Sequence, residues 1–330
     1  MTEIRTVDPS EPARREAVLI TGAAGYVGGL VTRALAGARG RFQTVVASDV
    51  RAVAEHERLD GVIYRQVDIR SAELGETIAE FGIDTIVHLA AIVSPRPGDE
   101  RSLQYSVDVQ GTRNLLEACV AHDVGKLVYT SSGAAYGYSP DNAALLREDD
   151  PLRGNEAFAY SWHKRLVEEM LDEYRHAHPN LHQVVLRVST VLGSGTRNQI
   201  TALFERKVVV GIKGVDSPFC FIWDQDLVAC IVEAVHGART GVFNITGDGV
   251  LTLREIANMM GRRYLGIDER LLTGALAFLN RRGWVPYGPE QVLFLRHRPV
   301  LANERLKRDF GFRPRKTSRE AFEVYRSSHG

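Results

Sequence analysis

Short apolar runs alternate with amphipathic segments along the first half of the 330-residue chain. The runs have the length and the Val and Ile content of β-strands, and several of the segments between them have helical spacing. Strands that alternate with helices form parallel sheets with helices on both faces. We therefore predict an α/β fold with a doubly wound parallel sheet. Its expected strands are Ala17–Thr21, Thr44–Ser48, Val62–Val67, Thr85–Leu89, Leu127–Thr130 and Val184–Arg187, and its clearest helices are Tyr26–Ala36, Ser106–His122 and Phe158–Arg175.

The alternation ends near Val188 and gives way to short pieces that contain Gly and Pro. Helices are expected there at Asp226–His236, Leu253–Met260 and Arg270–Leu279, and Gly241–Thr246 predicts one more strand of the main sheet. A smaller mixed lobe would then close over the carboxyl edge of the sheet, where doubly wound folds bind their ligands. The predicted division is a flexible tail over 1–16, a sheet domain over 17–187 and 219–248, and a substrate lobe over 188–218 and 249–330.

The charge balance limits the choice of partners. Lys plus Arg and Asp plus Glu each number 41, so the chain has no net charge that would favour nucleic acid or an anionic membrane. No apolar run is long enough to span a bilayer. Cys119, Cys220 and Cys230 lie far apart, which argues against a disulfide framework or a metal site and favours a reducing cytoplasm. A small molecule is therefore the expected partner.

A glycine-rich turn follows the first expected strand and opens the first helix. Gly22 allows a tight turn, Gly25 lets a pyrophosphate approach the backbone, and Gly28 lets the helix pack close to the strand. An anion would then face free N–H groups at the positive end of the helix. Because the strand and the helix stand where this motif requires them, the loop predicts a dinucleotide site that also includes Ala24, Tyr26 and Val27.

Two acidic residues follow the next two strands. Asp49 ends the second strand, about 20 residues after the glycines, where a carboxylate binds the 2′-hydroxyl of the adenosine ribose. A carboxylate would repel the additional phosphate of NADP, so NAD is favoured, although Arg51 keeps NADP as an alternative and a loop or capping role for Asp49 stays open. Asp68 would meet the adenine amino group or serve as a solvated turn residue.

Tyr160 and Lys164 are four residues apart on an expected helix, so their side chains share a face. A phenol has an ordinary pKa of roughly 10. An adjacent ammonium and a positive nicotinamide ring favour the phenolate, which lowers that pKa. Tyr160 could then take a proton from a substrate hydroxyl while a hydride leaves for NAD, and return it in the reverse direction.

Ser132 turns this common spacing into a candidate catalytic site. It lies at the end of an expected strand, where its hydroxyl can hydrogen-bond the reacting oxygen. Alone it would be interpreted as a capping serine, but it accompanies Tyr160 and Lys164. The neighbouring His163 points away from the catalytic face, so we expect a surface or packing role for it.

With these motifs in place, the chain resembles the extended short-chain dehydrogenase/reductase family, in its NAD-dependent epimerase/dehydratase branch. The resemblance runs from Ala17 to about Glu323 and includes His88-Leu89-Ala90-Ala91 and Leu186-Arg187-Val188. The segments Asp149–Gly154 and Gly193–Asn198 are most similar to a UDP-glucose 4-epimerase-like subgroup. The resemblance implies a Rossmann domain and a homodimer that packs Ser106–His122 and Phe158–Arg175 into a four-helix bundle.

The resemblance also implies roles for individual residues. Ser132, Tyr160 and Lys164 become the catalytic residues, with Lys164 also holding the nicotinamide ribose. Together with the motifs above, the predicted NAD contacts are Gly22, Ala24, Gly25, Tyr26, Val27, Gly28, Asp49, Asp68, Ile69, Leu89, Ala90, Ala91, Tyr160, Lys164, Arg187 and Val188. The predicted substrate contacts are Ser132, Thr190, Arg197, Phe219 and Arg298.

Departures from the family pattern concentrate where a nucleotide sugar would bind. Asp108 stands where many epimerases have Asn, Thr190 stands in a stretch that often carries Asn, Phe219 replaces an Arg, and Trp223 replaces a His. Two polar contacts to a pyrophosphate are thus missing or weakened, while Arg298, Arg197 or Arg296 could supply positive charge. The leading hypothesis is an epimerase-like enzyme. The alternatives are an NAD(P)H-dependent dehydrogenase or ketoreductase with an apolar substrate, and a non-catalytic dinucleotide sensor.

Overall fold

The computed structural model describes residues 17–37, 42–93, 101–284 and 288–329, so the tail predicted over 1–16 lies outside the described residues. Seven parallel strands form the main sheet in the order β11-β6-β5-β4-β1-β2-β3. The strand order reverses at β1, which makes the carboxyl end of this strand the expected ligand site. The strands are β1 (Ala17–Thr21), β2 (Thr44–Asp49), β3 (Ile63–Gln66), β4 (Thr85–His88), β5 (Lys126–Ser132), β6 (His182–Val188) and β11 (Gly241–Ile245).

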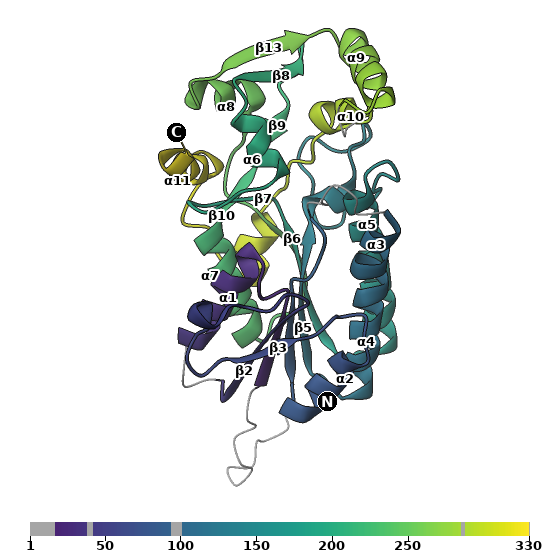
Figure 1. The fold of residues 1–330 in the computed structure, drawn as a ribbon, viewed down its shortest axis with the longest axis vertical. Coiled ribbons are helices and arrows are strands. Elements are labelled where there is room, and N and C mark those ends of the chain that lie inside the picture. Colours follow the sequence, from purple (N-terminus) through teal and green to yellow (C-terminus); the bar gives the residue numbers. More distant parts are fainter. Residues whose placement is uncertain (1–16, 38–41, 94–100, 285–287, 330) are drawn as a thin grey trace.

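Helices cover both faces of this sheet, which confirms the doubly wound fold (Figure 1). One face packs against α1 (Tyr26–Gly37) and α7 (Asp224–His236). The other packs against α2 (Glu73–Phe81), α4 (Gly111–Ala121) and α5 (Ala159–Ala177). Val and Ile favour strands and leave both faces of the sheet apolar, so each layer of helices buries one of them.

The helix expected at Ser106–His122 is longer and less regular than predicted. It begins as α3 (Arg101–Tyr105), passes through a π-helical turn, η2 (Ser106–Gln110), and continues as α4. A π turn holds one residue more than an α turn, and apolar spacing does not signal it. The turn buries Asp108, a polar residue that a continuous amphipathic helix would not be expected to hide.

The smaller mixed lobe lies above the sheet in Figure 1. Its strand pairs are β8 (Val208–Ile212) with β13 (Arg263–Ile267), β9 (Pro218–Phe219) with β12 (Leu251–Thr252), and β7 (Thr190–Leu192) with β10 (Phe221–Trp223). Phe204, Phe219, Phe221 and Phe322 pack against one another at the centre of its core, mostly edge to face. Its helices are α6 (Gln199–Phe204), α8 (Leu253–Met259), α9 (Glu269–Arg281), α10 (Gln291–Arg296) and α11 (Ser318–His329).

Short helical turns complete the fold: η1 (Glu55–Glu57), η3 (Gly133–Tyr136) and the π turn η4 (Leu306–Phe310). Across the described ranges, none of the helices has the length and apolar character needed to cross a membrane.

Candidate active site

The glycine-rich turn is built so tightly that its glycines have no room for side chains. Gly22 has a φ of +75°, and a Cβ on it would lie 2.7 Å from the backbone nitrogen of Ala90. A Cβ on Gly28 would lie 2.1 Å from the carbonyl oxygen of Gly22. The Gly25 amide donates to that same carbonyl at 3.0 Å. These contacts bring the start of α1 against the end of β1, as a dinucleotide loop requires.

Asp49 lies beside this turn at the end of β2. Its Oδ2 accepts a hydrogen bond from the Ala24 amide at 3.1 Å, and its Oδ1 accepts from the amide and the guanidinium of Arg51. The carboxylate is therefore held next to the loop by both residues. This is the position in which an acidic residue would meet an adenosine ribose.

Tyr26 begins α1, and its phenol extends away from the glycine turn towards α7. Its hydroxyl donates to Asp224 Oδ2 at 2.5 Å, and burial, followed by this hydrogen bond, raises the pKa of Tyr26 to about 12. The loop residues that are predicted to contact the cofactor thus have two different environments. Ala24, Gly25 and Val27 line the helix start, whereas the Tyr26 side chain connects the loop to the second sheet-covering helix.

Asp68 and Ile69 follow β3 and differ in their surroundings. The Asp68 carboxylate pairs with the Arg70 guanidinium, whose hydrogen bond lowers the pKa of that carboxyl. Ile69 is buried and packs against Gly111. Leu89 donates its amide to Thr21 at 3.1 Å, which places Leu89, Ala90 and Ala91 next to the glycine turn.

The three predicted catalytic residues meet at the end of β5 and the start of α5. The Ser132 hydroxyl lies close enough to the Tyr160 phenol to lower the pKa of that phenol, in opposition to its burial. The Lys164 ammonium lies 5.7 Å from the centre of the Tyr160 ring and donates to Tyr129 Oη at 2.9 Å and to the Thr130 carbonyl at 2.8 Å. The helical spacing predicted this juxtaposition, but it did not predict Tyr129 as the direct partner of Lys164.

The electrostatics of this cluster differ from the expectation. Burial raises the pKa of Tyr160 above its ordinary value, and the hydrogen bond with Ser132 opposes this only in part. Burial also lowers the pKa of Lys164 to about 8. The expected lowering of the pKa of Tyr160 includes the charge of a nicotinamide ring; the chain's own groups do not produce it, because the cost of burying a phenolate is larger.

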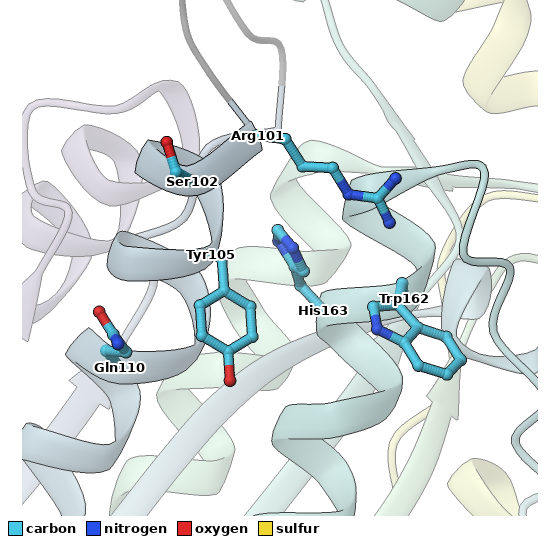
Figure 2. A pocket seen from close by; sticks show the side chains of 6 residues that line it. All are labelled: Arg101, Ser102, Tyr105, Gln110, Trp162 and His163. Carbon is cyan, nitrogen blue, oxygen red and sulfur yellow. The ribbon is translucent and has the colours of Figure 1, made fainter.

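His163 is buried rather than exposed, and it contacts the π turn. Its Nδ1 lies 2.9 Å from Asp108 Oδ2, and the other carboxylate oxygen, Oδ1, accepts from the Ile92 amide at 2.8 Å. Figure 2 shows the His163 ring beside Tyr105, with which it makes an edge-on contact at 5.6 Å. Sequence reasoning noted Asp108 as a departure but missed this pair, since 55 residues separate its members.

A hollow of about 540 Å³ opens beside this pair, on the outer side of α3 and α5 (Figure 2). Tyr160 and Lys164 do not line it. Gln110, Trp162 and His163 of its lining belong to Ser106–His122 and Phe158–Arg175, the segments for which the family resemblance implies a subunit contact. Its lining residues are Arg101, Ser102, Tyr105, Gln110, Trp162 and His163.

Arg187, a predicted cofactor contact, is buried at the end of β6. Its guanidinium pairs with the Glu168 carboxylate at 2.8 Å and donates to Tyr136 Oη and to the Glu148 carbonyl. These charged neighbours raise the pKa of Arg187 above its usual range despite its burial. The side chain is therefore engaged by the protein and ties α5 to the sheet, with Val188 buried next to it.

The predicted substrate residues are placed very differently from one another. The Arg298 guanidinium is stacked between two rings, 3.9 Å from the centre of Phe219 and 4.4 Å from the centre of Phe294. Its Nε and Nη1 are buried and lack hydrogen-bond partners among the described residues. Phe219 has no exposed surface, Thr190 is half-buried in β7, and Arg197 is exposed. Tyr138 makes an edge-on contact with the Phe294 ring at 5.2 Å and so joins Arg298 to the catalytic side.

The described residues contain no group of His, Cys, Asp and Glu that could hold a metal ion. The sequence profile of the NAD dependent epimerase/dehydratase family matches residues 18–245. This match covers the glycine turn, Asp49 and the Ser132, Tyr160 and Lys164 cluster. The chain belongs to the NAD-dependent epimerase/dehydratase family. It is an enzyme family, and its cofactor is NAD.

Related proteins align with most of the chain. An uncharacterized protein of Mycobacterium tuberculosis is 25% identical over 323 residues, which cover 97% of this chain and 85% of the relative. UDP-glucose 4-epimerase of Azospirillum brasilense is 28% identical over 309 residues and covers 82% of this chain and 87% of its own. The Thermus thermophilus UDP-glucose 4-epimerase complex with NAD has the same fold, with a TM-score of 0.74, 23% identity, and 95% and 98% of the two chains covered.

Proposed function

We propose that the enzyme transfers a hydride between NAD and a secondary alcohol of a nucleotide sugar, in an epimerase-like reaction. The observation that carries this proposal is the cluster of Ser132, Tyr160 and Lys164 at the carboxyl edge of the sheet, beside the glycine turn. A sensor that only binds the dinucleotide would need the turn but not this cluster. The similarity to UDP-glucose 4-epimerases over most of the chain supports the substrate class.

In this proposal, Ser132 positions the reacting oxygen and Tyr160 moves its proton. NAD, held by the glycine turn, Asp49 and Lys164, would supply the hydride acceptor and a positively charged ring. The Ser132 hydroxyl opposes in part the rise in the pKa of Tyr160 that burial causes, and the Lys164 ammonium lies 5.7 Å from the centre of the Tyr160 ring. Tyr160 takes the hydroxyl proton as the alcohol becomes a ketone and returns a proton when the hydride comes back. Return to the other face of the ketone would invert the carbon.

Arg298 is the proposed anchor for the anionic part of the substrate. Two of its nitrogens are buried and lack partners among the described residues. A buried donor without a partner costs free energy, so these N–H groups favour a ligand oxygen. Tyr138 connects Arg298 with the catalytic side, because its ring contacts Phe294, over which Arg298 lies, and Phe158, which directly precedes α5. An anion on Arg298 would therefore hold the rest of the substrate near the catalytic cluster. Thr190 and Arg197 remain proposed contacts, and Arg197 is the weaker because it is exposed.

One observation favours a second candidate, an NAD(P)H-dependent dehydrogenase or ketoreductase with a more apolar substrate. Phe219 stands where nucleotide-sugar enzymes often carry a second arginine, and it lies under Arg298 with no exposed surface. Arg298 thus lacks the second cation that a diphosphate would favour. The two candidates differ in whether NAD stays bound through the cycle or is exchanged.

The experiment that tests the proposal begins with the purified protein. Denaturation should release about one NAD per chain, because an epimerase retains its cofactor, whereas an exchanging dehydrogenase would release little. Added UDP-sugars should then stabilise the protein thermally and be converted to their epimers without net reduction of NAD. Release of NAD with turnover of no UDP-sugar would reject the nucleotide-sugar substrate class.

Replacement of Tyr160 by Phe distinguishes catalysis from sensing. The variant keeps the ring and loses the proton, so turnover should fall by about 10²- to 10⁴-fold while NAD stays bound. The matched control is Tyr138→Phe, which removes a phenol on the substrate side but not the proposed proton carrier. Near wild-type turnover in Tyr160→Phe would contradict the mechanism and favour the dinucleotide sensor.

We also propose a homodimer in a reducing cytoplasm. The hollow beside α3 and α5 would lie at the subunit contact and be covered by a second copy. The three cysteines are free and buried, which fits a compartment without disulfides. Sedimentation analysis of the purified protein would test the dimer, and a monomer at micromolar concentration would contradict it.

A further inference from the structure

The outer end of the smaller lobe carries an amphipathic helix with an uncovered apolar stripe. Helix α9 lies with β13 at the end of this lobe that is farthest from the main sheet (Figure 1). Leu272 and Leu276 face the lobe, and Leu272 is 7% exposed. Leu271 and Phe278 lie on a second stripe, because residues seven apart return to the same side of a helix. They are 69% and 52% exposed.

One further apolar side chain extends this stripe beyond the helix. Trp284 is 68% exposed, and its ring makes an edge-on contact with the Phe278 ring at 6.3 Å. Single exposed apolar residues are normal on a protein surface, but several on one edge mark an interaction site. We call Leu271, Phe278 and Trp284 the tip patch.

Positive charge surrounds the tip patch. Residues 262–284 contain five arginines and two acidic residues. Asp268 caps the start of α9, and Glu269 pairs with Arg296, so neither acid neutralises the arginines at the other end of the helix. Arg282 lies over the Phe278 ring at 5.0 Å, and neither Arg281 nor Arg282 forms an ion pair with a residue that the structure describes. The zero net charge of the chain conceals this local excess.

We propose that the tip patch docks on the surface of an anionic membrane. Exposed Leu, Phe and Trp flanked by arginines are the composition of a helix that lies in the interface of a bilayer. Trp and Phe would insert at the level of the headgroups, and the long arginine side chains would reach the lipid phosphates. Arg281 and Arg282 argue against a second copy at this place, because a two-fold contact over the stripe would bring like charges together.

The proposal goes beyond the catalytic function and needs no membrane-spanning segment. The catalytic residues lie at the carboxyl edge of the sheet, and the tip patch lies at the opposite end of the smaller lobe (Figure 1). Variants of the patch should therefore leave turnover of soluble substrate unchanged. A failure of membrane binding would leave the proposed chemistry intact, and a failure of the chemistry would leave membrane binding intact.

Co-sedimentation with vesicles tests the proposal directly. The full-length protein should bind vesicles of phosphatidylcholine mixed with phosphatidylglycerol much more tightly than vesicles of phosphatidylcholine alone, and added salt should weaken this binding. The double variant Phe278→Ser with Trp284→Ser should bind at least about tenfold more weakly. Leu145→Ser is the matched control, since Leu145 is also exposed, at 45%, but lies outside the patch.

The arginines are tested separately from the apolar residues. Arg281→Gln with Arg282→Gln should weaken binding to the anionic vesicles by about thirtyfold, because each arginine near an anionic surface contributes roughly 1 kcal/mol. Arg33→Gln with Arg58→Gln, two exposed arginines outside both the tip patch and the proposed dimer contact, should leave binding unchanged. Absence of binding to either vesicle, or equal loss in the control variants, would overturn the proposal. So would self-association of the wild type that disappears in Phe278→Ser with Trp284→Ser, because it would show that a second copy covers the patch.

Discussion

The glycine turn and the surroundings of Arg298 bind their proposed ligands by different means. The turn is defined by backbone: its glycines exclude side chains, and its partners are amides and carbonyls. Arg298 is defined by side chains, with a guanidinium between two aromatic rings and buried N–H groups that lack partners among the described residues. Because the glycine turn binds through its backbone, most substitutions there disrupt the turn rather than change which ligand it binds. The ligand preference of the Arg298 site, in contrast, can be changed by substitution of one side chain. The cofactor of this enzyme is thus easier to infer than its substrate.

The largest effect is expected at the turn, from Gly28→Ala. Its Cβ would lie 2.1 Å from the Gly22 carbonyl oxygen, so α1 would have to move away from β1. The free energy of unfolding should fall by about 3 kcal/mol, and NAD binding should weaken with it. Chemical denaturation and calorimetric titration would measure both. Gly29→Ala is the control, because the nearest atom to its Cβ is 3.8 Å away; a similar loss there would show that the close approach is not the cause.

A pH effect is expected at Lys164, which lies between the two regions. Burial lowers its pKa from 10.5 to about 8, so above pH 8 the folded chain loses a proton that the unfolded chain still holds. Stability from this group therefore rises with pH, by about 2 kcal/mol between pH 8 and pH 10. Unfolding of the wild type and of Lys164→Met should show this difference in slope. Parallel curves would mean that Lys164 is not desolvated as the structure indicates.

On the substrate side, Arg298→Gln should weaken substrate binding by about twentyfold through the loss of a charged hydrogen-bond donor. NAD binding should remain as in the wild type. The change in KM and the affinity for NAD would be measured on the same preparation. Arg197→Gln is the matched control, since Arg197 is exposed, and a larger effect there than at Arg298 would exchange their proposed roles.

The smallest effect is expected at the edge of the turn, from Asp49→Asn. The amide keeps an oxygen for the Ala24 amide, so the loop should stay intact. Loss of the negative charge should raise the affinity for NADP relative to NAD by about tenfold. Titration with both dinucleotides would show this change. An unchanged ratio would mean that Asp49 does not face the adenosine ribose.

Features set by neighbours in the sequence were predictable. The strands, the glycine turn and the pairing of Tyr160 with Lys164 each follow from a local spacing. Features set by distant residues were not. The contact of His163 with Asp108 and that of Arg187 with Glu168 depend on how α5 packs on the sheet and on the π turn. The raised pKa of Tyr160 was missed for the same reason, because burial depends on every element around the phenol.

The π turn at Ser106–Gln110 determines in which direction the side chains of α3 point relative to those of α4. Each residue of an α-helix turns the chain by about 100°. Deletion of one residue from the turn would restore a continuous α-helix and rotate α3 by that angle relative to α4. Arg101, Ser102 and Tyr105 would then leave the hollow beside His163. Deletion of one residue would therefore turn the side chains of α3 away from His163 while α5, which carries Tyr160 and Lys164, keeps its place on the sheet.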